Sequence, residues 1–150
     1  GSLYRRGRNR SDSMTTTLKC HVGIGAIVEG EALVAKDDFS ARYDLDRIKG
    51  VFSRPDHALA GQSYHDKILV LNTAKGGVAT AWMLHEMKTR GIVPKAILFN
   101  SANTILAQGA ALAGLTMCDR FEDGDVTDLI RQGDTLIVDP KKGEVIIKNR

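Results

Sequence analysis

The middle of the chain alternates short runs of consecutive apolar residues with segments that have helical periodicity. The runs at 67–72, 96–100 and 115–118 are bounded by polar residues, a pattern typical of buried strands. Helices are expected between them, at 78–90 and at about 103–113. The order strand–helix–strand–helix–strand predicts parallel strands that are joined by right-handed crossovers.

The first of these helices has apolar residues at helical spacing, so one of its faces is expected to pack against the strands. The residues that share this face are Thr80, Met83, Leu84 and Met87. We also expect Trp82 to lie in the core, and His85 to lie on the exposed or partly covered side of the helix.

The two ends of the chain have the pattern of antiparallel strands. Residues 19–28 and 31–36 are expected to form a hairpin, with Glu29 and Gly30 as its tight turn. A short helix and a second hairpin are expected near the C-terminus, at 126–132, 135–138 and 144–148. The fold class is therefore α/β, with a parallel β-α-β-α-β core and flanking β-hairpins.

Composition restricts the class of protein. Of the 150 residues, 43% are hydrophobic and 26% are charged, which excludes a disordered chain. No apolar run reaches the roughly 18 residues that a membrane span needs, so we expect a soluble protein. Aromatic residues make up only 5% of the chain, which disfavours binding of single-stranded nucleic acid by base stacking.

The net charge of +3 comes from the first 13 residues, which carry four arginines and one aspartate. We expect residues 1–13 to be a tag or a disordered leader, with an RNA-binding arm as the alternative. Residues 14–150, in which basic and acidic residues balance, are expected to form a single domain. Cys20 and Cys118 have no metal-ligand spacing, so we expect reduced thiols in a cytoplasmic protein.

The strongest local signal for chemistry lies between the first buried strand and the first helix. Gly76 and Gly77 allow close approach of the backbone, and the N–H groups of the helix start favour an anion. Lys75 adds a positive charge at the same turn. We therefore expect Lys75, Gly76 and Gly77 to bind an anionic substrate group, whereas the alternative is that the glycines only permit a tight turn.

A second candidate lies in the segment 37–62, which has little periodicity. Loops of this length are usually functional or disordered. Arg54 and His57 are candidates to bind a carboxylate or to move protons. The alternative is a solvated loop in which Arg54 pairs with Asp56.

Other polar residues lie where strands are expected to end. Asp37 and Asp38 follow a strand, and capping of a turn is favoured there over binding a metal or acting as a base. Asn100 and Asn103 lie at the carboxyl end of a parallel strand, where α/β sites usually lie. The four histidines have no paired ligand spacing, so we expect this chain alone to bind no metal.

Taken in order, the segments resemble the small subunit, or swivel domain, of aconitase X. A His-Ala-Leu-Ala-Gly-Gln motif at 57–62 precedes a strand, a glycine-bearing turn and a helix at 67–87. The remaining matching segments are a Pro-x-Ala-Ile strand at 94–99, an Ile-Leu-Ala-x-Gly-Ala helix at 105–110 and a Gly-Asp hairpin at 133–139. The resemblance covers nearly all of 22–148, and its specificity lies in the order and spacing of the segments.

The resemblance implies the swivelling β/β/α fold of the mobile domain of aconitase. It also implies a large aconitase X catalytic subunit as partner, which would carry an iron or iron–sulfur centre, while this chain binds no cofactor alone. Activities in the family are dehydrations of hydroxy acids, by cis-3-hydroxy-L-proline dehydratase in bacteria and phosphomevalonate dehydratase in archaea. Neither nucleic acid nor a membrane is expected as a partner.

Two segments depart from the family pattern. The usual turn reads Gly-Arg-Gly-Ser with the serine as proton acceptor, but here Lys75 stands for the arginine and Gly77 for the serine. The usual Ser-Phe-x-Gly-Gly segment is also altered, around Ser40. Glycine has no side chain to accept a proton, so Thr80 and Ser40 are the candidate catalytic hydroxyls. The exact substrate is open.

Three other interpretations stay open. The chain could be a non-catalytic binding or regulatory module that kept the swivel fold without the serine. It could bind nucleic acid through its basic leader. It could also be a phosphohistidine-type swivelling carrier, which would need a histidine near the glycine-bearing turn, although none occurs in 66–84.

Overall fold

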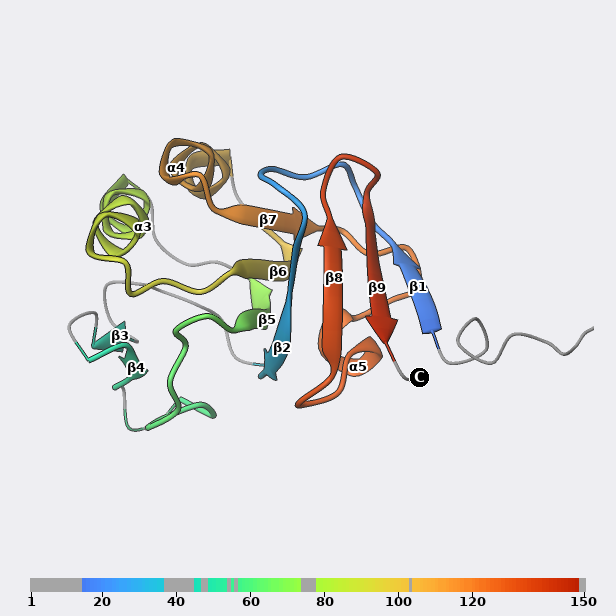
Figure 1. Cartoon of the computed structure of the whole chain (residues 1–150), viewed down its shortest axis with the longest axis horizontal. Helices are drawn as coiled ribbons and strands as arrows, with labels where there is room; N and C mark the ends of the chain where they lie inside the picture. The colour runs from blue at the N-terminus through green and yellow to red at the C-terminus, as the bar shows by residue number, and fades with distance from the viewer. Residues whose placement is uncertain are drawn as a thin grey trace, which may run out of the picture.

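The computed structural model describes residues 15–36, 45–46, 49–53, 55, 57–73, 78–102 and 104–148, with the backbone alone at 45–46 and 78–81. A seven-stranded mixed sheet is the framework of these residues (Figure 1). Its strands are β1 (Thr15–Lys19), β2 (Val28–Val34), β5 (Ile68–Thr73), β6 (Ala96–Ser101), β7 (Thr116–Asp119), β8 (Thr135–Asp139) and β9 (Glu144–Lys148). They follow the order β1-β9-β8-β2-β5-β6-β7.

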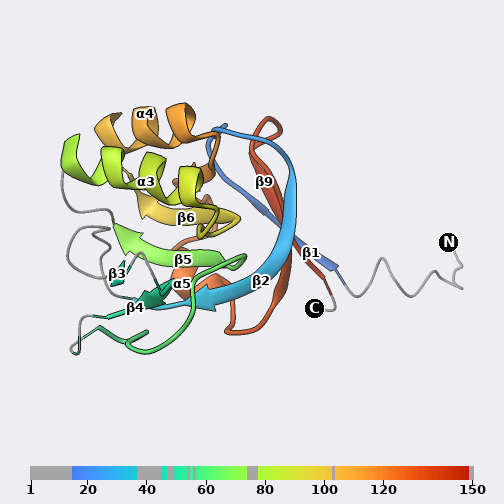
Figure 2. The same ribbon diagram turned by 60° about the vertical axis from the view of Figure 1, so that its left-hand side comes forward.

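Strand β2 joins a parallel half of the sheet to an antiparallel half. Its first residues, 28–31, pair antiparallel with β8, and residues 32–34 pair in parallel with β5. Beyond it, β5, β6 and β7 are parallel, whereas β8, β9 and β1 are antiparallel. Figure 2 shows β2 curving strongly between the two halves, as a strand shared by two sheet directions must.

Helices cover the parallel half on one face. The helices α3 (Val78–Arg90) and α4 (Thr104–Ala113) lie side by side above β5, β6 and β7 (Figure 2). Strand β5 is buried on both faces: Leu69 and Leu71 belong to the core under these helices, and Ile68 and Val70 belong to a second core. This burial explains why residues 68–71 are all apolar rather than alternating between apolar and polar.

The second core lies inside the curved sheet, whose outer strands come together through residues 20–27. Ile24 exchanges two backbone hydrogen bonds of 2.9 Å with Met117 of β7. On the other side, the N–H of Gly23 donates to Pro140 O at 2.8 Å, in the loop between β8 and β9. The sheet is thereby closed around apolar side chains from both of its halves. The short helix α5 (Val126–Leu129) contributes Val126 to this core.

The N-terminal hairpin expected at 19–36 is wrong. Glu29 and Gly30 continue through β2, opposite Ile137 and Leu136, and β1 pairs with β9 instead. Gly23 interrupts the expected first strand, because a Cβ there would lie 2.2 Å from the carbonyl oxygen of Met117. Only glycine permits this close backbone contact, so it serves the closure of the sheet and not a turn.

Most of the other expected elements are confirmed. The parallel core, the helix at 78–90 and the C-terminal hairpin all form at or within one or two residues of their expected bounds. The helix expected at 126–132 is shorter and ends at Leu129, because Ile130 adopts an extended conformation. In the segment at 37–62, β3 (Leu45–Asp46) and β4 (Val51–Phe52) pair with each other, and residues 37–44 lie outside the described part.

The helix face in α3 is as expected, with one exception. Leu84 and Met87 are fully buried and Met83 is partly buried. Trp82, expected in the core, has 68% of its surface exposed, because it lies on the outer side, where its ring meets His85 edge to face. His85 is exposed, as expected. Among the described helices, none is both long and apolar enough to cross a membrane.

Candidate functional site

Polar side chains gather at the carboxyl edge of the parallel strands. Asn72 lies at the end of β5, Asn100 at the end of β6 and Asp119 at the end of β7. Parallel strands bring their carboxyl ends to one edge, where ligands of α/β sheets usually bind. The segment 74–77, which lies outside the described residues, follows β5 directly in the sequence. We therefore take this edge as the candidate site.

Asn100 connects three elements at this edge. Its side-chain nitrogen Nδ2 donates to Asn72 Oδ1 at 3.1 Å and to Asp125 Oδ1 at 2.9 Å. Its Oδ1 accepts from the N–H of Val126, at the start of α5, at 2.8 Å. The amide thus uses both of its polar atoms to hold β5, β6 and α5 in register. These hydrogen bonds therefore give Asn100 a positioning role in this structure.

Asp125 caps α5 and carries the negative charge of this network. Its carboxylate accepts from the N–H of Thr127 at 2.9 Å and from the Thr127 hydroxyl at 2.6 Å. Hydrogen bonds from Thr127 and then from Asn100 hold the pKa of Asp125 below its usual value, and Lys36 adds to the effect. Lys36 lies 3.8 Å from Asp125 and 2.5 Å from Asp128. The Asp125 carboxylate is consequently ionised at neutral pH.

A cation lies at the end of β7. Arg120 has a φ of 59°, a left-handed conformation that is costly for a residue with a Cβ. Its N–H donates to Asn100 O at 3.1 Å, and its Nε lies 3.8 Å from Asp119 Oδ2, which also accepts from the N–H of Ala102. The guanidinium side chain is 60% exposed. Arg120 is thus a backbone-anchored positive charge that is accessible to an anion.

His57 has a different environment from the one the sequence indicated. It is buried, with 3% of its surface exposed, and its ring stacks on Phe52 at 4.8 Å. Its Nδ1 accepts from the N–H of Leu59 at 3.1 Å, so the imidazole holds its own loop together. The alternative of a solvated loop is therefore wrong at His57, and a role for His57 in substrate binding stays a prediction.

The other predicted site residues cannot be placed. Ser40, Arg54, Lys75, Gly76, Gly77 and Asn103 lie outside the described residues. Thr80 lies in the first turn of α3, where the backbone alone is described. Their roles stay predictions. Within the described part of the chain, no three His, Cys, Asp or Glu side chains are grouped to hold a metal ion.

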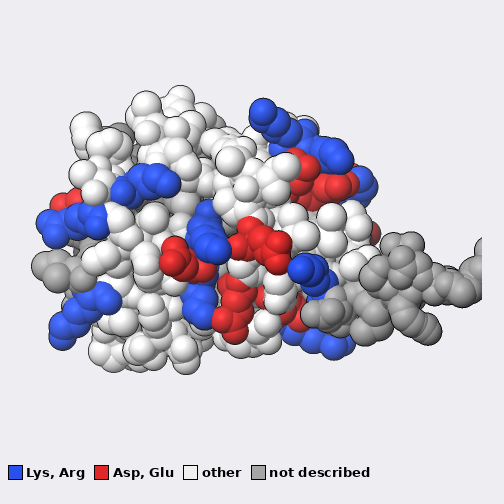
Figure 3. Space-filling view, viewed as in Figure 1, with Lys and Arg blue, Asp and Glu red and all other residues white. Residues whose placement is uncertain are grey.

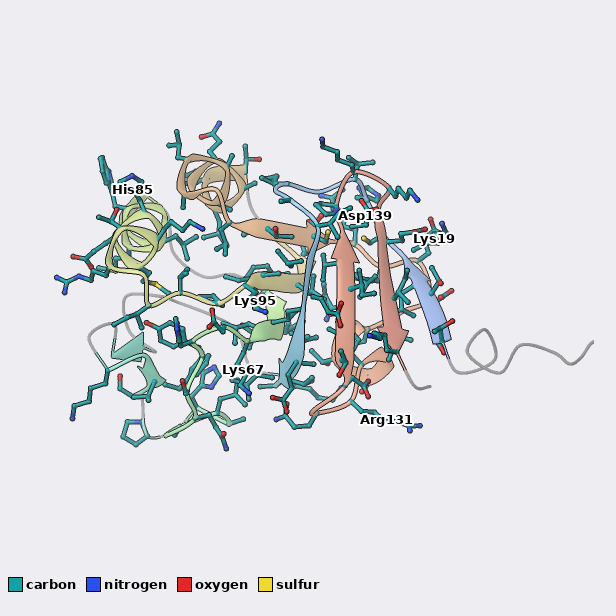
Figure 4. The ribbon with its side chains drawn as sticks, in the orientation of Figure 1. Lys19, Lys67, His85, Lys95, Arg131 and Asp139 are labelled. Atoms are coloured by element: carbon teal, nitrogen blue, oxygen red, sulfur yellow. The ribbon has the colours of Figure 1, made fainter. Side chains whose placement is uncertain are left out.

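Charged side chains around β2 are used in pairing. Lys67 pairs with Glu31, and Lys148 pairs with Glu29 at 3.1 Å. Lys95 donates to the carbonyl oxygen of Glu29 at 2.8 Å, and Figure 4 shows Lys67 and Lys95 on the same side of β2. On the face in Figure 3, basic and acidic side chains consequently alternate across the middle of the sheet. The described residues on this face therefore form no continuous basic stripe.

Sequence reasoning missed several members of this edge. Asn72, Asp119, Arg120 and Asp125 were not singled out, although Asn100 was. Asn72 and Asp119 each end a buried apolar run, and that shared position was a usable signal. The approach of Asp125 to Asn100 had no signal in the sequence, because it depends on how α5 packs against the sheet.

Comparison with known proteins places these features in a family. The profile of the aconitase X swivel domain matches residues 17–147. The chain is 36% identical over 124 residues to the phosphomevalonate dehydratase small subunit of Thermococcus sibiricus, covering 83% of this chain and 92% of that protein. It is 29% identical to the protein of the same name from Methanococcoides burtonii, covering 91% of this chain and 99% of that protein.

A solved structure has the same fold. The crystal structure of aconitase X from Thermococcus kodakaraensis, in its holo-form, superposes with a TM-score of 0.81 at 30% sequence identity. The match covers 88% of this chain and 98% of the other. The similarity therefore extends over most of this chain and nearly all of the other, and it is not confined to the parallel core.

Proposed function

The chain belongs to the aconitase X swivel domain family, and from this membership we propose that it dehydrates a hydroxy acid together with a large subunit. In this assembly it is the small subunit of a hydro-lyase. The observation that carries the proposal is the match over 17–147, which spans the sheet from β1 to β9. The relatives from Thermococcus sibiricus and Methanococcoides burtonii are matched over 92% and 99% of their own length, so the likeness is to nearly complete small subunits.

Dehydration of a hydroxy acid breaks a C–O bond and a C–H bond on the neighbouring carbon. The enzyme must hold the carboxylate, accept the proton and assist departure of the hydroxyl group. The iron or iron–sulfur centre expected in the large subunit would act as a Lewis acid toward that hydroxyl. The part proposed for this chain is to bind and orient the substrate and to exclude water when the domain closes on the large subunit.

We assign substrate binding to the carboxyl edge of the parallel strands. Lys75, Gly76 and Gly77 precede the 13-residue helix α3, whose first N–H groups favour an anion. Arg120 adds an exposed charge from the end of β7. Substrate-binding roles are also proposed for Arg54, His57, Asn100 and Asn103. These groups would hold the carboxylate, or a phosphate where the substrate has one, when the domain closes on the large subunit.

The proton acceptor is proposed to be a hydroxyl group, with Thr80 and Ser40 as the candidates. Thr80 lies in the first turn of α3, close in sequence to the position at which the family usually has serine. A threonine hydroxyl is a weak base unless a neighbouring group activates it. Substitution of each hydroxyl should therefore distinguish them, because loss of the acceptor lowers kcat and not only substrate affinity.

Two substrates should be compared. The curated relatives are phosphomevalonate dehydratase small subunits, and other activities in the family act on cis-3-hydroxy-L-proline. Both substrates carry a carboxylate and a hydroxyl group, but only one carries a phosphate. The test is to mix the chain with its large subunit and measure the dehydrated product of each compound in the ultraviolet or by mass. Absence of turnover of both compounds by the complete pair would contradict this assignment.

The role of Lys75 can be tested in the same assay. A charge-assisted hydrogen bond contributes about 1.5–3 kcal/mol, so Lys75→Ala should lower kcat/KM by about 10- to 200-fold. Lys88→Ala is the matched control, since Lys88 is an exposed lysine in the last turn of α3, about 15 Å along the helix from its start. Equal activities of the two variants would show that the turn at 75–77 has a structural role only.

A second candidate function rests on Gly77, which stands where the family usually has serine. The chain would then be a non-catalytic module that kept the fold and its partner. If so, wild-type chain would bind the large subunit without restoring turnover, and Gly77→Ser would create activity. If the wild-type pair is already active, another residue accepts the proton.

A further inference from the structure

Closure of the sheet brings two cysteines together that are far apart in the sequence. Cys20 follows β1 directly, and Cys118 lies in β7. Both are free and buried, with 8% and 1% of their surfaces exposed, and both belong to the second core. The core that contains both cysteines also contains side chains from the parallel and the antiparallel halves of the sheet.

Backbone contacts on both sides fix the two cysteines in place. The N–H of Cys20 donates to Gly143 O at 2.9 Å, and the next N–H, of His21, donates to Asp119 O at 3.2 Å. Gly23 lies against the pair, since a Cβ there would be 2.8 Å from Cys118 Sγ. The hydrogen bond between His21 and Asp119 and the contact of Gly23 with Cys118 therefore place the two cysteines beside each other in a well-packed seam, and a disulfide requires cysteines that are neighbours in space.

The surroundings of the two thiols shift their pKa values in opposite directions. The hydrogen bond from Cys118 lowers the pKa of Cys20, whereas the hydrogen bond with Cys20 and then burial raise the pKa of Cys118. Cys20 is also the more exposed of the two. Since the thiolate is the nucleophile in thiol oxidation, Cys20 is the thiol that reacts first.

We propose that Cys20 and Cys118 form a modification site at which a hydroperoxide produces an intramolecular disulfide. The Cys20 thiolate attacks one peroxide oxygen, the O–O bond breaks, and Cys20 becomes a sulfenic acid while the other oxygen leaves as hydroxide. The Cys118 sulfur then attacks Cys20 Sγ, the S–O bond breaks, and the departing oxygen leaves as water with the Cys118 proton. Two thiols and one hydrogen peroxide give one disulfide and two molecules of water.

The disulfide would join the end of β1 covalently to β7. Cys118 is next to Asp119, whose carboxylate holds the N–H of Ala102 at the carboxyl edge of the sheet. Oxidation would therefore act on the seam directly beside the candidate site. The site depends only on this chain, so its test does not depend on the proposed dehydratase activity.

The test uses the purified full chain, reduced, freed of reductant and treated with hydrogen peroxide. It is then unfolded, alkylated with N-ethylmaleimide and weighed by intact mass spectrometry. We expect the number of alkylated thiols to fall from two to zero, with dithiothreitol restoring both, and the chain to remain a monomer on a non-reducing gel. Peptide mapping should identify a disulfide-linked peptide that contains Cys20 and Cys118.

Single substitutions assign the order of the steps. Cys118→Ser should leave a Cys20 sulfenic acid that dimedone traps, whereas Cys20→Ser should leave Cys118 alkylatable after the same treatment. Circular dichroism checks that each variant is folded. If a variant does not fold, peptide mapping of the oxidised wild type decides whether the disulfide forms. The proposal is overturned if both wild-type thiols stay alkylatable, if they gain oxygen without forming the disulfide, or if the disulfides link different chains.

Discussion

Replacing Asp125 with alanine should lower the free energy of unfolding by about 1–3 kcal/mol at neutral pH. Loss of an N-cap side chain costs about 0.5–2 kcal/mol. The variant also removes one partner of the Asn100 amide, which is worth about 0.5–1.5 kcal/mol. Asp125 makes these contacts from one carboxylate, so a single change removes the cap of α5 and its hydrogen bond to β6.

The effect should depend on pH. The pKa of Asp125 is lowered in the folded chain, so its ionised form stabilises the fold above the ordinary carboxyl pKa of about 3.9. That contribution is lost as the pH falls through the lowered pKa. The stability difference between wild type and Asp125→Ala should therefore be constant from pH 7 to pH 5 and should shrink below about pH 4.

Urea unfolding followed by circular dichroism measures this difference at each pH. Asp125→Asn keeps a capping oxygen without the charge, so it should cost less than alanine and show a weaker pH dependence. Asp128→Ala is the matched control, because it removes a neighbouring carboxylate whose pair with Lys36 is exposed, and such pairs contribute about 0–1 kcal/mol. Equal losses for Asp125→Ala and Asp128→Ala, or a difference that persists unchanged at pH 3, would refute the reasoning.

Four further variants test the packing and the backbone conformation. Met87→Ala should cost about 2–5 kcal/mol because it empties a buried position, whereas Trp82→Ala on the outer face should change stability by no more than about 0.5 kcal/mol; similar values for the two would contradict the assigned faces of α3. Gly23→Ala should cost about 1–3 kcal/mol in urea unfolding, since its Cβ would meet Met117 O, and an unchanged midpoint would argue against this closure. Arg120→Gly should leave the Tm unchanged or raise it, because glycine adopts a positive φ without strain, while a lower Tm would give the arginine side chain a structural role.

Local patterns were sufficient to predict the parallel half of the fold. The runs at 67–72 and 96–100 are apolar because both faces of β5 and β6 are buried, and α3 follows from apolar residues at helical spacing. Those signals lie within each element, so the sequence alone carries them. The anion-binding turn was likewise predicted from consecutive residues, Lys75 to Gly77, and stays a prediction.

Tertiary packing decided the features that depend on residues distant in the sequence. Gly30 has the residue type of a turn, yet it lies within β2, because the pairing of β2 with β8 and β5 outweighs a local preference. Asp125 meets Asn100 only because α5 packs against the sheet. Cys20 lies near Cys118 only because residues 20–27 close the sheet by bonding to β7 and to the loop after β8. Contacts of this kind leave no periodic signal, since each depends on how two separately formed elements come together in space.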